Sequence, residues 1–244
     1  MIPGTERVSC TPVTHLPDHM LFVMLAVLFP IRAATFGYRK LDQAAEDDVP
    51  RVRLWLYRQI LAIQWSLAAL VILLWIVFRR PWGDVGLVLV PSWGLLGVTV
   101  GLLIGATFIA LRSRGAGEEA HAGVRRRVQH IERMLPHDAR ELRWFSAVAI
   151  TAGVCEELLY RGYLIWYLGH WLPLTLAVAA SAILFGVGHF YQGPRGMILT
   201  ACVGAFLAAV YLVSGSLFAP MAFHALMDLY SGHVTYRAFQ RAAA

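Results

Sequence analysis

Several residue types are absent from the chain or scarce in it, and these shortages exclude some classes of protein. It contains no asparagine, one lysine (Lys40) and three cysteines in 244 residues. Without asparagine there is no N-glycosylation sequon. Three cysteines are too few for a disulfide scaffold, and their odd number leaves at least one thiol unpaired. Charged residues make up only 15% of the chain, whereas soluble domains contain about a quarter.

Hydrophobic residues make up 58% of the chain, which excludes a disordered chain and argues against an ordinary soluble enzyme. A transmembrane helix needs about 20 mostly apolar residues. Candidate segments lie near 19–37, 56–78, 87–111, 144–169, 171–191, 195–213 and 217–236. The first is the weakest, because Pro30 and Arg32 interrupt it. The predicted fold class is an all-α, polytopic transmembrane helix bundle with about seven spans.

The net charge of +6 comes from arginines that lie mostly between the apolar segments. With the N-terminus outside, the basic loops near 38–55 and 112–143 and the C-terminal tail fall on one side, which the positive-inside rule assigns to the cytoplasm. Because topology explains the charge, no nucleic-acid partner is expected. The preference for arginine and the lack of asparagine are typical of a GC-rich bacterial genome, so we expect an integral protein of a bacterial cytoplasmic membrane.

The longest polar segment, 112–143, is predicted to contain an amphipathic helix on the inner membrane surface. Apolar residues recur there at helical spacing, at Ala120, Val124, Val128, Ile131 and Leu135, with arginines around them. We expect the basic face of such a helix to bind anionic lipid. The alternative is a connecting helix that serves only topology.

Three further patterns concern helix ends and packing. Asp138 followed by Glu141 is typical of an N-cap that opens the fourth span. A double G-x-x-x-G in the third span predicts close packing of another helix, at Gly97, Gly101 and Gly105. Cys155 has no base beside it in the sequence, so we expect a small buried packing residue rather than a nucleophile.

Three clusters of ionisable residues fall inside the last four predicted spans, where a charge costs several kcal/mol and is rare. They comprise Glu156, Glu157, Arg161, His189, His224 and Asp228. A lone histidine in a membrane is often only a hydrogen-bonded packing residue, and a Glu–Arg pair is often structural. Six such residues in four neighbouring spans nevertheless indicate a functional site.

The spacing of these residues suggests different tasks. Glu157 and Arg161 are one turn apart on one helix face, so they are expected to neutralise each other. Adjacent helical residues point about 100° apart, which leaves Glu156 without a local partner and suits a general base. His224 and Asp228 are also one turn apart, so the carboxylate can fix the tautomer of the imidazole or stabilise its charged form.

Three short motifs in this region resemble those of the CPBP family, the CAAX-protease and bacteriocin-processing intramembrane proteases. Gly153 to Gly162 resembles the E-E-x-x-x-R motif, Phe185 to His189 the F-x-x-x-H motif, and His224 to Asp228 the H-x-x-x-N/D motif. Their order and spacing fit the family, and the resemblance covers residues 138–232.

This resemblance implies an endopeptidase that hydrolyses a peptide bond in a membrane-associated or C-terminal substrate segment. Glu156 would activate water, and His189 would help to hold that water. His224 and Asp228 would stabilise the tetrahedral oxyanion.

The remaining motif positions, Glu157 and Arg161, would support the site structurally.

The predicted organisation of the chain is an N-terminal tail (1–18), N-terminal transmembrane helices with the basic loop (19–137), a catalytic transmembrane core (138–236) and a C-terminal tail (237–244).

One residue departs from the prenyl-protease branch, which carries asparagine where this chain has Asp228. An ionised aspartate would repel an oxyanion, so Asp228 is either protonated or acts through His224. A prenylated CAAX substrate is therefore less firmly implied than protease activity.

The sequence leaves two alternatives for the cofactor. Glu156, His189, His224 and Asp228 are ligand types that zinc accepts, but no H-E-x-x-H pair places two histidines on one helix face. We expect a glutamate-activated water without a metal, with zinc as the alternative.

Two other functions also fit these residues. A peptide-binding or bacteriocin-immunity protein of the same fold would hold a peptide without cutting it. A transporter or proton relay would also place Glu, His and Asp inside the membrane, although the sequence shows no inverted repeat.

Overall fold

The computed structural model describes residues 14–28, 30, 38–89, 91, 93–114 and 117–242. No strand occurs among these residues, so the all-α prediction is confirmed. The longer elements are α1 (Leu16–Val23, continued by the π-helical η1, Met24–Leu28), α4 (Val49–Val77), α5 (Trp93–Arg114), α6 (Glu118–Val128), α7 (Ala139–Glu157), α9 (Leu174–Gly188), α10 (Gly193–Ser214) and α11 (Phe218–Ala242). The shorter ones are α3 (Tyr38–Asp42), η3 (Glu46–Asp48), η4 (Trp82–Val85), η5 (Gln129–Met134), η6 (Leu158–Leu164), α8 (Ile165–Leu168) and η7 (Phe190–Gln192).

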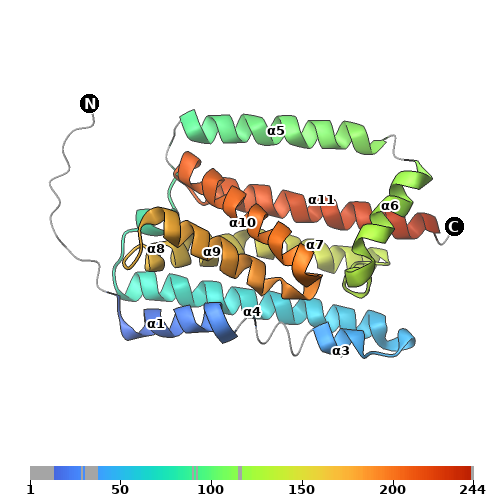
Figure 1. The fold of residues 1–244 in the computed structure, drawn as a ribbon, viewed down its shortest axis with the longest axis horizontal. Helices are drawn as coiled ribbons and strands as arrows, with labels where there is room; N and C mark the ends of the chain where they lie inside the picture. The colour runs from blue at the N-terminus through green and yellow to red at the C-terminus, as the bar shows by residue number, and fades with distance from the viewer. Residues whose placement is uncertain are drawn as a thin grey trace.

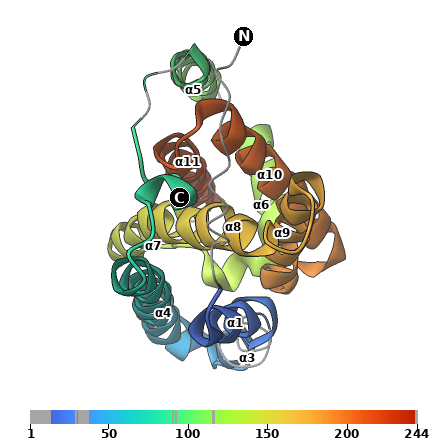
Figure 2. The same cartoon turned by 90° about the vertical axis from the view of Figure 1, so that its left-hand side faces the viewer.

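Most helices run along the long axis of the bundle (Figure 1), and α7 lies among them when the bundle is viewed end-on (Figure 2). Helix α7 packs against α4 and α11, whereas α9 packs against α10. Helix α5 lies at the edge, where it touches α10 and α11. The short α3, the crossing helix α6 and the end of α11 lie at one end of the bundle. The segments predicted to face the cytoplasm therefore share that end.

In the described part of the chain, each predicted span coincides with a helix. To cross a membrane, a helix must also be long enough and apolar enough. Two helical stretches meet that demand, Glu46–Val77 and Phe190–Ser214. Shorter apolar helices run over Leu16–Leu28, Gly94–Gly105 and Leu174–Gly188. The number of seven spans therefore stays a prediction. Residues 29 and 31–37 of the first predicted span lie outside the described residues.

The first helix begins at Leu16, inside the segment predicted as a tail, and Asp18 fixes it to the bundle. Asp18 is fully buried and accepts two hydrogen bonds from the Arg80 guanidinium, at 2.8 and 2.6 Å. Its backbone carbonyl accepts a hydrogen bond from the Tyr163 hydroxyl at 2.6 Å. Arg80 also lies over the ring of Trp166. These contacts join α1 to the end of α4 and to η6.

The helix predicted within 112–143 is present as α6 followed by η5. Arg125 donates to the Ala238 carbonyl of α11 at 2.8 Å. Arg133 donates to three backbone carbonyls at the end of α3 and pairs with Glu46. Two of the arginines in this basic segment therefore bind the protein itself and hold α6 and η5 against α11 and α3.

Asp138 caps α7 as predicted, because its side chain accepts a hydrogen bond from the Glu141 backbone N–H at 2.8 Å. The Glu141 carboxylate is buried and pairs with Arg53 of α4 at 2.5 Å. The residue that completes the cap thus also joins α4 to the start of the helix that carries the glutamate pair.

Two glycines allow helices to meet backbone to backbone. A Cβ at Gly153 would lie 2.6 Å from the Ala225 nitrogen, so α7 and α11 touch one turn before Glu156. A Cβ at Gly186 would lie 2.6 Å from the Met197 carbonyl oxygen, so α9 and α10 meet in the same way near His189.

The packing predicted for the double G-x-x-x-G of α5 is wrong for the described chain. A Cβ at Gly97, Gly101 or Gly105 would meet no described atom within 4 Å. The close contact of α5 lies instead at Gly94, against the Val213 carbonyl of α10. Small residues permit a close approach but do not require it, because the positions of the neighbouring helices decide which face is covered.

We expect Gly153→Ala to destabilise the protein, because the added methyl group must displace the backbone of α11. Overpacking of this kind costs about 1–3 kcal/mol. Gly97→Ala is the matched control, since the same methyl group enters open space in a helix that alanine favours. Thermal unfolding in detergent micelles measures both variants. Equal melting temperatures for the two would contradict the close contact of α7 with α11.

Candidate active site

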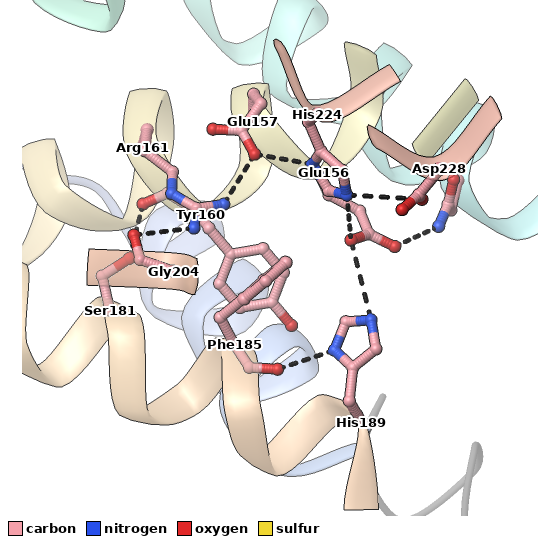
Figure 3. A network of polar contacts seen from close by, with 11 residues as sticks. Glu156, Glu157, Tyr160, Arg161, Ser181, Phe185, His189, Gly204, His224 and Asp228 are labelled. Atoms are coloured by element: carbon pink, nitrogen blue, oxygen red, sulfur yellow. Dashed lines mark hydrogen bonds and ion pairs between the residues drawn. The ribbon is translucent and has the colours of Figure 1, made fainter. Parts of the chain in front are cut away.

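Two adjacent glutamates, Glu156 and Glu157, end α7 where the chain continues as the π-helical η6. They are 8% and 0% exposed. Because neighbouring helical residues diverge by about 100°, their carboxylates have different sets of partners (Figure 3). A π-helical turn within an α-helix often marks a functional site. Here Ser181 of α9 donates to the Tyr160 carbonyl of that turn at 2.8 Å.

Glu157 lies at the centre of a buried charged network. Its Oε1 accepts a hydrogen bond from Arg161 at 2.8 Å and lies 2.8 Å from His224 Nδ1. Arg161 also donates to the Gly204 carbonyl of α10 at 2.9 Å. The predicted pairing of Glu157 with Arg161 is confirmed. Because the network reaches α10 and α11, it also fixes the position of the His224 ring.

Glu156 faces a second set of polar groups. Its Oε1 accepts a hydrogen bond from Gln64 Nε2 of α4 at 2.6 Å. Its Oε2 lies 4.0 Å from His189 Nε2 and 4.0 Å from His224 Nε2 (Figure 3). These two separations are too long for direct hydrogen bonds, but a single water oxygen bridges polar groups at such a distance. Groups from α4, from α11 and from the residue that follows α9 thus surround one carboxylate of α7.

His189 follows the last residue of α9, and its ring is held by its own helix. Its Nδ1 lies 2.8 Å from the Phe185 carbonyl oxygen. A carbonyl oxygen only accepts hydrogen bonds, so Nδ1 donates and Nε2 is left to face Glu156. The Phe185 ring lies 4.3 Å from the Arg161 guanidinium and edge-on to His224. The F-x-x-x-H motif therefore packs an aromatic ring against the charged network and orients the imidazole.

Asp228 lies at the more open side of the cluster, and its side chain is 39% exposed. Its Oδ2 is 3.5 Å from His224 Nε2, at the outer limit of a hydrogen bond. The Nδ1 of the same ring is 2.8 Å from Glu157. The orientation of His224 is therefore set first by Glu157 rather than by Asp228. The spacing along α11 could not show this, because Glu157 comes from another helix.

The structure brings Glu156, His189, His224 and Asp228 together, and sequence reasoning missed Gln64 in this group. Gln64 is a polar side chain within the apolar segment 56–78, and that position is the one signal that marked it. No motif pointed to it, because its partner lies 92 residues further along the chain.

The side chains do not form a ready metal site. Among the described residues, no group of three or more His, Cys, Asp and Glu side chains is placed to hold a metal ion. Glu156 Oε1 is bonded to Gln64, and His224 Nδ1 faces Glu157. The Nε2 atoms of both histidines lie 4.0 Å from Glu156 Oε2. The expectation of a glutamate-activated water without a metal therefore stays a prediction, and the steps proposed below involve none.

Cys155 is fully buried beside Glu156, as predicted for a packing residue. Cys202 is exposed, and Cys10 lies outside the described residues.

Comparison with protein families places part of the chain in a known context. A family model described as type II CAAX prenyl endopeptidase Rce1-like matches residues 139–230. The matched segment runs from the start of α7 into α11 and contains all three motifs, whereas Gln64 lies outside it. No curated protein and no solved structure gave a match.

Proposed function

We propose that the protein is an intramembrane endopeptidase in which Glu156 activates a water molecule, because residues 139–230 match a family model of type II CAAX prenyl endopeptidases. The observation that carries the proposal is the convergence of His189 Nε2 and His224 Nε2 on Glu156 Oε2, each at 4.0 Å. A carboxylate that faces two imidazoles across a water-sized distance is an arrangement suited to general-base catalysis.

In the proposed reaction, a water held by Glu156 Oε2 and His189 Nε2 attacks the carbonyl carbon of the scissile peptide bond. The Glu156 carboxylate takes one proton from that water as the new C–O bond forms. When the tetrahedral intermediate collapses, the C–N bond breaks and the same proton passes to the leaving nitrogen. The products are a carboxylate and an amine terminus, and Glu156 is ionised again.

His224 is proposed to stabilise the oxyanion. To donate from Nε2 while Nδ1 bonds to Glu157, the ring must carry both protons, and the carboxylates of Glu157 and Asp228 on its two sides stabilise that cation. Asp228 therefore acts through His224, since an ionised carboxylate placed directly at the oxyanion would repel it.

We also propose that the bundle lies within the membrane with about seven spans and its C-terminus in the cytoplasm. Large apolar side chains are exposed on four long helices, as expected of faces that meet lipid. They include Leu73, Ile76, Leu96, Leu103, Ile183, Ile198, Leu199 and Phe206. The substrate is proposed to be a membrane-associated or C-terminal peptide segment.

The proposal is tested by mapping peptide N-termini in membranes from cells that express the wild type or Glu156→Gln. Termini that occur only with the wild type would identify both cleavage and substrate. If both proteins are inserted at equal levels and no terminus differs, protease activity is contradicted. A peptide that co-purifies equally with both would then favour binding or immunity.

The exposed Arg126 and Arg127 of α6 are proposed to bind anionic lipid, because Arg125 and Arg133 are engaged by the protein. We expect phosphatidylglycerol to raise the melting temperature of the micelle-bound protein more than phosphatidylcholine does. The double variant Arg126→Gln/Arg127→Gln should lose that difference. If it keeps the difference, these two side chains are not the lipid site.

A further inference from the structure

Gln64 lies on α4, outside the segment matched to the protease family, and its side chain touches the Glu156 carboxylate. The residue is 4% exposed, and its Nε2 lies 2.6 Å from Glu156 Oε1. Building on the function proposed above, we infer that Gln64 is a positioning residue that aims Glu156 Oε2 at the two imidazoles.

The chemistry of the two groups sets the direction of this hydrogen bond. An ionised carboxylate only accepts hydrogen bonds, so the amide nitrogen of Gln64, rather than its oxygen, faces Glu156. A hydrogen bond to a charged acceptor is shorter and stronger than one between neutral groups. The separation of 2.6 Å is in keeping with that class.

Fixing one oxygen of a carboxylate also fixes the other, because both belong to one planar group. The last torsion of a glutamate side chain is otherwise broad, so the carboxylate is free to turn about it. With Oε1 held by Gln64, Oε2 points to the gap between His189 Nε2 and His224 Nε2. The amide thus decides which direction the proposed base faces.

The carbonyl oxygen of the Gln64 side chain supports a role beyond packing. Gln64 Oε1 is buried and has no hydrogen-bond partner among the described residues. A buried acceptor without a partner destabilises the folded protein, and an apolar side chain at this position would avoid that cost. The unpaired oxygen belongs to the same amide that binds Glu156, so it lies near the proposed base.

A simple bond between helices is the alternative, and the chain offers a matched example of one. Trp65, the next residue, donates from Nε1 to the Thr151 hydroxyl at 3.1 Å and joins the same two helices, α4 and α7. Trp65→Phe removes that bond without touching Glu156. It is therefore the control for variants of Gln64.

Infrared spectroscopy of the purified protein tests the inference without any substrate. The difference between the wild type and Glu156→Gln isolates the carboxylate stretch of Glu156. The same difference recorded in a Gln64→Met background should show that band at a shifted frequency, whereas a Trp65→Phe background should leave it in place. A band that does not shift in the Gln64→Met background would overturn the inference.

Kinetics on a peptide that spans the mapped cleavage site provide the second test. We expect Gln64→Met to lower kcat about 10- to 100-fold through misplacement of the base, with KM changed less than about twofold, and Trp65→Phe to keep kcat. Gln64→Glu supplies a donor only while its carboxyl group holds a proton, so its kcat relative to the wild type should fall as pH rises. The inference is contradicted if Gln64→Met and Trp65→Phe lower kcat equally and the kcat ratio of Gln64→Glu to the wild type does not change with pH. The hydrogen bond between Gln64 and Glu156 would then be only structural.

Glu156→Gln separates failure of this inference from failure of the proposed function. If Glu156→Gln cleaves at the wild-type rate, the proposed protease mechanism is wrong. If Glu156→Gln is inactive while Gln64→Met keeps the full kcat, the mechanism stands and the positioning role of Gln64 is wrong.

Discussion

Glu156→Gln is expected to lower peptide cleavage by about 10²- to 10⁴-fold, the range that a positioned general base contributes. The amide has the shape of the carboxylate but cannot take a proton from water. It keeps an oxygen that can accept from Gln64, and Glu156 has no cation within direct hydrogen-bond distance. The melting temperature should therefore stay near that of the wild type. Cleavage of the mapped peptide and thermal unfolding in micelles measure the two effects.

Glu119→Gln is the matched control for this variant, because it removes an exposed carboxylate from α6. It should change neither rate nor stability. An active Glu156→Gln enzyme would show that another group activates the water. A variant that unfolds would mean instead that the Glu156 charge serves structure.

The second large effect concerns the neighbouring glutamate. We expect Glu157→Gln to lower the free energy of unfolding by about 3–5 kcal/mol, the loss typical when one partner of a buried ion pair is removed. Glu157 is fully buried, Arg161 is 1% exposed, and His224 shares the same carboxylate oxygen. Its loss leaves two buried cationic groups without their common partner. Chemical denaturation in micelles measures the change.

The double variant Glu157→Gln/Arg161→Met should recover part of this loss, because it removes the unpaired guanidinium as well. Arg51→Gln breaks an exposed pair with Asp48 and should have no measurable effect. If Glu157→Gln were as stable as Arg51→Gln, the network would not hold the site together. We therefore expect Glu156→Gln to lose activity and Glu157→Gln to lose stability, although the two residues are adjacent in sequence.

Local signals were enough to predict most of the helices and the start of α7. Hydropathy predicted the helical segments, and the spacing of Asp138 and Glu141 predicted the cap of α7. The pairing of Glu157 with Arg161 followed from one turn of helix. Each of these predictions depends on residues within a few positions of one another, where the helix alone sets the geometry.

Contacts between helices did not follow from such signals. The glycines of α5 carry the pattern of a packed face, yet the close approach occurs at Gly153 and Gly186. The partner of His224 Nδ1 is Glu157 of another helix rather than Asp228, one turn away. Asp228 does lie 3.5 Å from the Nε2 of His224, but the spacing along α11 could not show that a nearer partner from a packed helix faces Nδ1.

By itself, the sequence determined an all-α chain with three clusters of ionisable residues in apolar surroundings, and motifs that resemble a family of intramembrane proteases. These features depend on composition and on spacing within single helices. The tertiary structure alone decided that Glu156 Oε2 faces both imidazoles, that Glu157 holds His224, and that Gln64 completes the group. The physical reason is that these atoms come from separate helices. Their distances depend on how α4, α7, α9 and α11 pack, and no spacing along the chain encodes that packing directly.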